Sequence, residues 1–128
     1  MRIERRELIA WTVAAVGTGM VSAQEGRQMY GLIGKMKVAD GQRDALIAIL
    51  LQGTGAMPGC LSYVVAEDPA DANAIWITEV WDSKESHAAS LALPEVKAAI
   101  AKGRPLITGF ENGVTTIPVG GVGLPVRK

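Results

Sequence analysis

The stretch AIWITEVWDSKESHAASLALPEVKAAI, residues 74–100, decides the fold because its hydrophobic period changes once along its length. Its first eight residues alternate from side to side, as in an extended strand. Trp76 falls on one face of this strand. The other face is formed by Ile75, Ile77, Glu79 and Trp81. The sequence therefore predicts a strand that places a carboxylate and an indole side by side on an apolar face.

Two short helices are expected directly after this strand. Asp82 is a good N-cap, and Glu85 completes a capping-box pattern that would start a helix at Ser83. Pro94 cannot continue that helix but suits the first turn of another. The first helix holds the only histidine of the chain, His87. If the protein has a pocket, we expect this segment to line it.

The rest of the chain supplies further strands and one more helix. Strands are expected at residues 28–38, 60–67 and 107–119, with a bend or bulge at Asn112-Gly113 in the last. Asp40 is expected to cap a helix that runs to about Gln52. Residues 68–73, DPADAN, predict a turn that makes a hairpin of the two strands flanking it. The glycine-rich residues 120–128 are either a frayed tail or an arm laid on a partner.

This order of elements, β-α-β-β-α(α)-β, predicts an α+β fold of the ferredoxin-like, split βαβ type. Its four-stranded antiparallel sheet would carry the helices on one face. The other face would remain apolar and exposed in a monomer. We therefore expect a homodimer in which two sheets pack face to face, with Trp76 in the contact.

Residues 1–23 are expected to be an export signal. Arg2, Arg5 and Arg6 form a basic head, an uncharged apolar run follows, and small residues precede a cleavage point before Gln24. Arg5-Arg6 also fits a twin-arginine signal. The alternatives are an uncleaved anchor or a misassigned start. Cleavage would leave residues 24–128 as one domain in the periplasm or medium, free of the membrane.

Charge and cysteine content narrow the classes of function. Without residues 1–23 the chain carries ten basic and eleven acidic side chains, a net charge of −1, so no binding of nucleic acid is expected. Cys60 is the only cysteine and has no partner for an internal disulfide. One cysteine and one histidine cannot form a tetrahedral zinc site. We expect no metal.

Three segments resemble one known family. The sequences PGCLSYVV at 58–65, ITEVWDSKES at 77–86 and LPEVKAAI at 93–100 are similar to antibiotic biosynthesis monooxygenase (ABM) domains, nearest to the quinol-monooxygenase-like members. The resemblance extends over residues 30–119. It implies a dimeric α/β-barrel of ferredoxin-like subunits, each with a pocket between sheet and helices. It also implies oxygenation of a phenol or quinol by O2 without metal or organic cofactor.

The chain departs from this family at several positions. Histidines common in the family would fall at Ser90 and Glu95. The asparagine and axial histidine of the haem-degrading relatives would fall at Gly34 and Ile100, so no haem role is expected. A non-catalytic dimer that binds an aromatic ligand or serves as a scaffold is therefore the alternative function.

The candidate catalytic residues are His87 and Glu79. An imidazole titrates near pH ~6.5, which suits a general base that forms a phenolate. The alternative for His87 is a half-buried side chain bonded to a carbonyl or to Glu79. Glu79 would either orient His87 or form an ion pair with Lys35 or Arg104.

The candidate substrate-binding residues are aromatic and aliphatic. Trp81 would stack on a flat substrate and donate its indole N–H, or else fill the strand–helix corner as core. Tyr63 and Tyr30 are possible hydroxyl donors to a quinol oxygen. Leu91 and Ile100 would add apolar walls.

Overall fold

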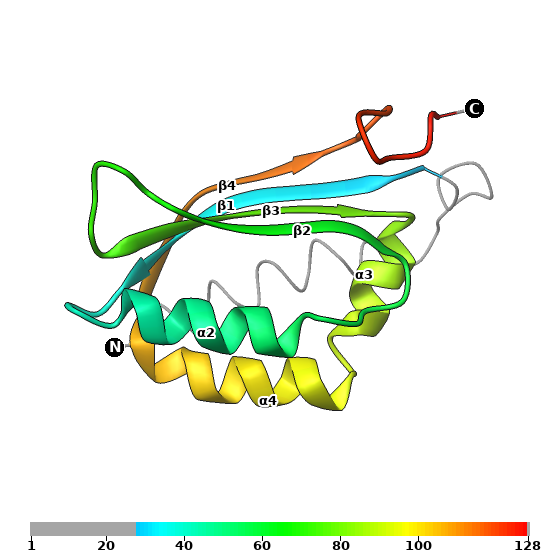
Figure 1. Cartoon of the computed structure of the whole chain (residues 1–128). Coiled ribbons are helices and arrows are strands. Elements are labelled where there is room, and N and C mark those ends of the chain that lie inside the picture. Colours follow the sequence, from blue (N-terminus) through cyan, green and yellow to red (C-terminus); the bar gives the residue numbers. More distant parts are fainter. Residues whose placement is uncertain (1–27, 128) are drawn as a thin grey trace.

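A computed structural model describes residues 28–127 of the chain (Figure 1). The predicted export signal, residues 1–23, lies outside the described residues. The elements in chain order are β1 (Tyr30–Val38), α2 (Arg43–Gly53), β2 (Cys60–Glu67), β3 (Ala74–Trp81), α3 (Lys84–Ser90), α4 (Pro94–Gly103), the 3-10 turn η2 (Arg104–Leu106) and β4 (Ile107–Thr116).

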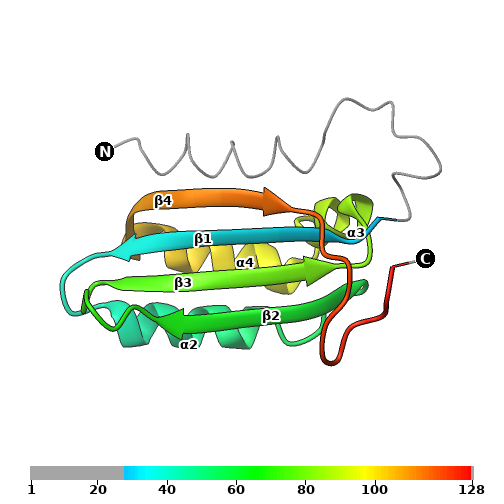
Figure 2. The ribbon, with the colours of Figure 1, turned by 90° about the horizontal axis from the view of Figure 1, so that it is seen from above.

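The strands form one antiparallel sheet in the order β2-β3-β1-β4, and the helices cover one of its faces (Figures 1 and 2). This confirms the predicted ferredoxin-like α+β fold. Figure 2 looks onto the uncovered face, with the helices behind the sheet. No helix within residues 28–127 is long and apolar enough to cross a membrane.

The central strand β3 behaves as its alternation predicts. Ile75 and Ile77 are fully buried on the helix side of the sheet, together with Leu46 from α2. Trp76 lies on the opposite face, where it is only partly buried. The same alternation carries Glu79 and Trp81 under the helices, at the end of the sheet where α3 begins.

Both predicted helix caps are wrong. The N-cap of α3 is Ser83, whose hydroxyl accepts a hydrogen bond from the Ser86 N–H at 3.1 Å. Asp82 is still held by the sheet, because its N–H donates to the Gly59 carbonyl at 2.9 Å. At α2 the N-cap position is Gln42, without a side-chain bond, while the Asp40 carboxylate accepts from Asn73 instead.

The predicted bulge in β4 is confirmed. Asn112 has a positive φ of 54°, and the pairing with β1 shifts by one residue between Ile33 and Lys35. Asn112 and Gly113 therefore stand opposite the single residue Gly34. The strand ends at Thr116 rather than at residue 119.

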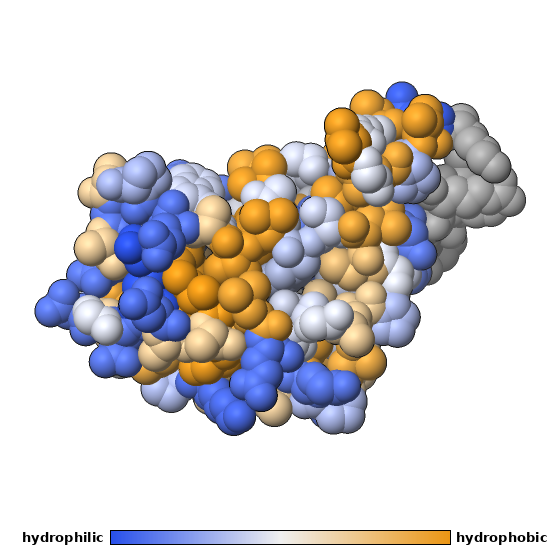
Figure 3. All heavy atoms as spheres, in the orientation of Figure 1, coloured by the Kyte–Doolittle hydropathy of each residue, from blue (hydrophilic) through white to orange (hydrophobic). Residues whose placement is uncertain are grey.

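The residues after β4 form a small hairpin instead of a frayed tail. Gly121 and Leu124 make an isolated bridge, and the Arg127 N–H donates to the Val119 carbonyl at 2.9 Å. Figure 2 shows this segment running across the ends of β1 and β3 toward β2. Val122 is fully exposed and Val126 is 77 % exposed. Figure 3 accordingly shows a hydrophobic surface on this segment.

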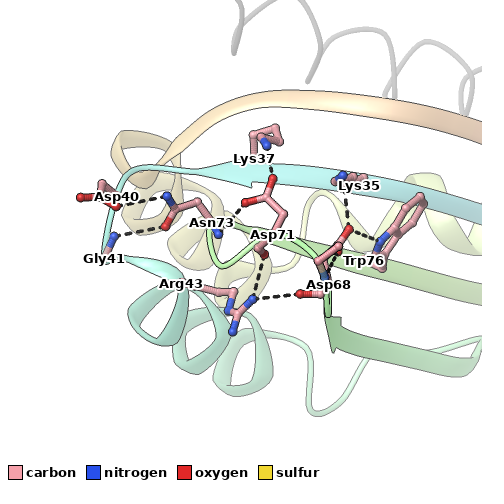
Figure 4. A network of polar contacts seen from close by, with 10 residues as sticks. Lys35, Lys37, Asp40, Gly41, Arg43, Asp68, Asp71, Asn73 and Trp76 are labelled. Atoms are coloured by element: carbon pink, nitrogen blue, oxygen red, sulfur yellow. Dashed lines mark hydrogen bonds and ion pairs between the residues drawn. The ribbon is translucent and has the colours of Figure 1, made fainter.

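A polar network fastens the opposite end of the sheet (Figure 4). Lys35 lies 3.2 Å from the Asp68 carboxylate, which also accepts the Trp76 indole N–H at 3.0 Å. Lys37 pairs with Asp71, and the Arg43 side chain donates to the backbone carbonyls of Asp68 and Asp71. The network joins β1, the β2–β3 turn and α2. Lys35 is thus paired with Asp68, so the alternative of a Lys35–Glu79 ion pair is wrong.

Candidate functional site

The site begins as two rows of side chains across the helix side of the sheet. Glu79 on β3 stands between Leu32 on β1 and Tyr63 on β2. Trp81, two residues further on, stands between Tyr30 and Cys60. Because side chains two residues apart on a strand share a face, these rows are adjacent. Most of the aromatic and ionisable groups proposed from the sequence therefore lie together.

Helix α3 adds the imidazole to these rows. The Ser83 cap starts the helix directly after β3. His87, four residues after the cap, points toward the sheet and is only 5 % exposed. The imidazole meets the Trp81 indole edge-on, with ring centroids 5.3 Å apart. It also lies against the Tyr30 ring at 5.5 Å. The structure thus brings the proposed base, its carboxylate and two aromatic rings into one buried cluster.

Glu79 is bonded to the indole rather than to the imidazole. The Trp81 Nε1–H donates to Glu79 Oε1 at 2.9 Å. His87 Nε2 lies 3.9 Å from the same oxygen, which is contact but longer than a hydrogen bond. The expectation that Trp81 donates its N–H to a substrate is therefore not met in this structure, because Glu79 accepts that N–H.

Burial sets the protonation of both groups. It raises the pKa of Glu79 to about 7, partly opposed by the hydrogen bond from Trp81. It lowers the pKa of His87 to about 4. At neutral pH the imidazole is uncharged, and the Glu79 carboxyl is near the midpoint of its titration. The contact is therefore not a fixed salt bridge, because the imidazole is neutral and the carboxyl is only partly ionised.

Two buried polar atoms of this cluster have no hydrogen-bond partner within residues 28–127. They are His87 Nδ1 and the Tyr30 hydroxyl oxygen. Burial is the main cause that raises the pKa of the Tyr30 hydroxyl. A polar contact with the Thr115 side chain, which does not meet hydrogen-bond geometry, lowers this pKa, and Glu79 raises it further. Unpartnered buried groups cost stability, so they are rare, and a bound ligand or water is one way to complete their bonding.

A hollow of about 240 Å³ opens beside Tyr30. Its wall is formed by Gln28, Met29, Tyr30, Lys84, Thr115, Thr116 and Ile117. Tyr30 is the residue that this wall shares with the buried cluster. The hollow exceeds the roughly 150 Å³ cavity that holds one benzene molecule, so a single substituted ring fits.

The remaining predicted residues lie at different distances from the hollow. Tyr63 is beside Glu79, and burial is the main cause that raises the pKa of its hydroxyl. Leu91 caps the end of α3, and Ile100 is half-buried on α4. Neither Leu91 nor Ile100 lines this hollow or a second one, of about 290 Å³, between α2 and α4.

The sequence reasoning missed Lys84 and Thr115. Lys84 lies three residues before His87, and residues at this spacing share a helix face. That spacing could have identified Lys84. Thr115 depends on the register of β4 against Leu32, which the bulge shifts and which no local pattern reveals. Within residues 28–127 no group of three or more His, Cys, Asp or Glu side chains is placed to hold a metal ion.

Comparison with known proteins gives a consistent family. The family model for antibiotic biosynthesis monooxygenases matches residues 29–102. A crystal structure from Chloroflexus aurantiacus, named for the same family, is 69 % identical, with a TM-score of 0.72 over 73 % of this chain and 95 % of that one. No match was found among curated proteins.

More distant structures share the fold alone. A protein from Nitrosomonas europaea, also named for the antibiotic biosynthesis monooxygenases, is 14 % identical, with a TM-score of 0.66 over 72 % of this chain and 91 % of that one. A conserved protein of unknown function from Bacteroides thetaiotaomicron is 18 % identical, with a TM-score of 0.63 over 71 % and 98 %. The family match spans more than half of the sequence, and the 69 % identical structure agrees with it. The chain belongs to the antibiotic biosynthesis monooxygenase family.

Proposed function

We propose that this protein is a cofactor-free monooxygenase that oxidises a phenol or quinol with O2 beside Tyr30. One observation supports this assignment above the others. A buried imidazole has an unpartnered Nδ1 on one side and a carboxyl with a pKa of about 7 on the other. We further propose that the reaction takes place outside the cytoplasm, after removal of residues 1–23.

The chemistry asks little of the protein beyond proton management. Triplet O2 reacts slowly with closed-shell molecules, so the substrate itself must become an electron-rich anion. A hydroquinone and O2 then give a hydroxyquinone and water, with all four electrons supplied by the ring. The protein has to accept the phenolic proton, stabilise the anion and exclude water.

The pKa values indicate where the proton ends. Transfer of a proton from a phenol with a pKa of about 10 to a base with a pKa of about 4, the value for His87, costs about 8 kcal/mol. The same transfer to Glu79, at about 7, costs about 4 kcal/mol. His87 therefore serves as a relay. The relay requires a shift of α3 that brings Nδ1 to the substrate and Nε2, now 3.9 Å from Glu79 Oε1, within hydrogen-bond distance of that oxygen. Nδ1 would then take the substrate proton while Nε2 passes a proton to Glu79.

The neighbouring aromatic residues would have supporting roles. The Tyr30 hydroxyl is buried and has no hydrogen-bond partner within residues 28–127, and it would bond the substrate oxygen once the ring turns toward the hollow. Trp81 holds Glu79 through its N–H and forms a wall through its ring. Tyr63 keeps the carboxyl in an apolar setting, which sustains its raised pKa.

Oxygen uptake with a panel of hydroquinones and phenols tests the proposal. Glu79→Gln keeps an oxygen for the Trp81 N–H but cannot accept the proton, and His87→Gln removes the relay. We expect each to lower kcat by about 100-fold or more. Lys102→Gln, on the distant face of α4, serves as the matched control. Unchanged uptake in both site variants would refute the proposed relay.

A second candidate function is a non-catalytic dimer that binds an aromatic ligand. It is favoured because neither Glu79 nor His87 lines the hollow and because Ser90 and Glu95 stand where relatives carry histidines. It predicts stoichiometric binding of a phenol, recovered unchanged, with no oxygen consumed by the wild-type protein.

A further inference from the structure

We propose that Lys84 makes the hollow beside Tyr30 selective for a single-ring aromatic acid, by pairing its ammonium group with the carboxylate of the ligand. This inference rests on the proposed function, since it names the substrate class of the same site. It assigns a role in specificity to a residue that takes no part in the proton relay.

The charges around the hollow support this choice. Among residues 28–127, seven side chains line the hollow, and Lys84 is the only charged one of these. Within residues 28–127 no carboxylate forms an ion pair with Lys84, although the partly buried Lys35 and Lys37 are each paired with an aspartate. The hollow therefore presents one unneutralised positive charge to whatever occupies it. An anionic group on the ligand would neutralise that charge.

The carboxyl groups near the hollow do not neutralise the positive charge of Lys84. Glu79 does not line the hollow, and burial keeps its carboxyl largely protonated below neutral pH. Asp82 and Glu85 flank Lys84 in sequence, but both are exposed and neither lines the hollow. The positive charge of Lys84 is therefore left for a ligand.

The position of Lys84 also orients the ligand. Lys84 and His87 are three residues apart on α3, so they share one face of the helix. Tyr30 borders both the hollow and the imidazole. A ring whose acid group meets Lys84 can therefore direct a hydroxyl toward Tyr30 and His87. Gln28, Thr115 and Thr116 add neutral polar groups to the wall.

The volume of the hollow suits a ligand of one ring. The hollow of about 240 Å³ has room for a hydroxybenzoate-sized molecule. We therefore expect monocyclic hydroxylated acids to bind better than their neutral counterparts. Since Lys84 is partly exposed, the charge should improve affinity by about tenfold rather than by orders of magnitude.

The test compares two ligands of nearly equal shape and different charge. 4-Hydroxybenzoate and 4-hydroxybenzamide are titrated by calorimetry into the wild-type protein, Lys84→Met and the control Lys102→Met, which alters the other hollow. We expect the acid to bind about tenfold more tightly than the amide to the wild type and to the control. In Lys84→Met the two affinities should become equal through loss of acid binding, with amide affinity retained. Lys84→Gln repeats the test if the methionine variant is unstable.

Equal affinities in the wild type, no binding of either ligand, or an acid preference that survives in both Lys84 variants would each overturn the inference. The titration needs no turnover, so it is separate from the test of the proposed function. Consumption of unsubstituted hydroquinone without an acid preference would refute the role of Lys84 alone. An acid preference with no oxygen uptake from any substrate would support the role of Lys84 and refute the oxygenase.

Discussion

At the scale of single residues, Glu79 and His87 exchange a proton on folding. Burial raises the carboxyl pKa from 4.5 to about 7 and lowers the imidazole pKa from 6.5 to about 4. Between about pH 4.5 and 6.5 the unfolded pair carries its proton on histidine, and the folded pair carries it on glutamate. The number of bound protons is the same in both states. The pair therefore contributes almost no pH dependence to stability in this window.

Removing either partner should reveal how the titration of the other makes the free energy of unfolding depend on pH. A lowered histidine pKa gives stability that is present above pH 6.5 and lost as pH falls toward 4. The free energy of unfolding of Glu79→Gln should therefore rise by about 3 kcal/mol as the pH is raised from 4 to 6.5. A raised glutamate pKa gives stability that is present below pH 4.5 and lost as pH rises through 7. His87→Gln should therefore lose about 3 kcal/mol over that range. Urea unfolding at a series of pH values measures both, and equal slopes in all three proteins would contradict this account.

The Tyr30 hydroxyl predicts a conflict between stability and function. It is buried without a partner within residues 28–127, so Tyr30→Phe should leave the free energy of unfolding unchanged or raise it by about 1 kcal/mol. The same change should weaken binding of phenolic ligands or lower their turnover. Thermal unfolding and ligand titration on one preparation check both effects. A destabilised variant would mean that the hydroxyl is already bonded.

At the scale of the elements, the sequence predicted the strands better than the joints between them. Alternation identified β3 and its buried face, and Asn112-Gly113 identified the bulge. The cap of α3 was missed because the Asp82 N–H is held by Gly59, a residue distant in sequence. The sequence alone leaves a Lys35–Glu79 pair open, because it does not give the register of the strands. Lys35 pairs with Trp76, which places it on the face opposite Glu79.

The cap of α3 can be tested with adjacent substitutions. Ser83→Ala removes the hydroxyl that accepts from Ser86 N–H and should destabilise the protein by about 1 kcal/mol. Asp82→Ala should change stability by less than about 0.5 kcal/mol. Denaturant unfolding of the two variants compares them directly. A larger loss in the aspartate variant would restore Asp82 as the cap.

At the scale of the whole molecule, the uncovered sheet face supports the homodimer expected from the sequence, which remains a proposal. Val64 and Val114 lie on that face with 49 % and 52 % exposure. Sedimentation equilibrium should give twice the monomer mass at micromolar concentration. Val64→Lys combined with Val114→Glu should shift it toward monomer. Leu51→Lys, an exposed position on α2, is the control. A monomeric wild type would contradict the proposal.

The network around Asp68 and Asp71 has a consequence for motion. Its ion pairs hold together the end of the sheet that is farthest from the hollow. Figure 3 shows a hydrophilic surface at this end, and Figure 4 shows the ion pairs. Local opening fluctuations should therefore be larger where Tyr30 and α3 meet than at the end held by the network. Amide deuteration along β1 should be slowest near Lys37 and fastest near Tyr30. By stiffening one end of the sheet, these ion pairs would leave the larger fluctuations at the end where a small molecule has to enter the hollow.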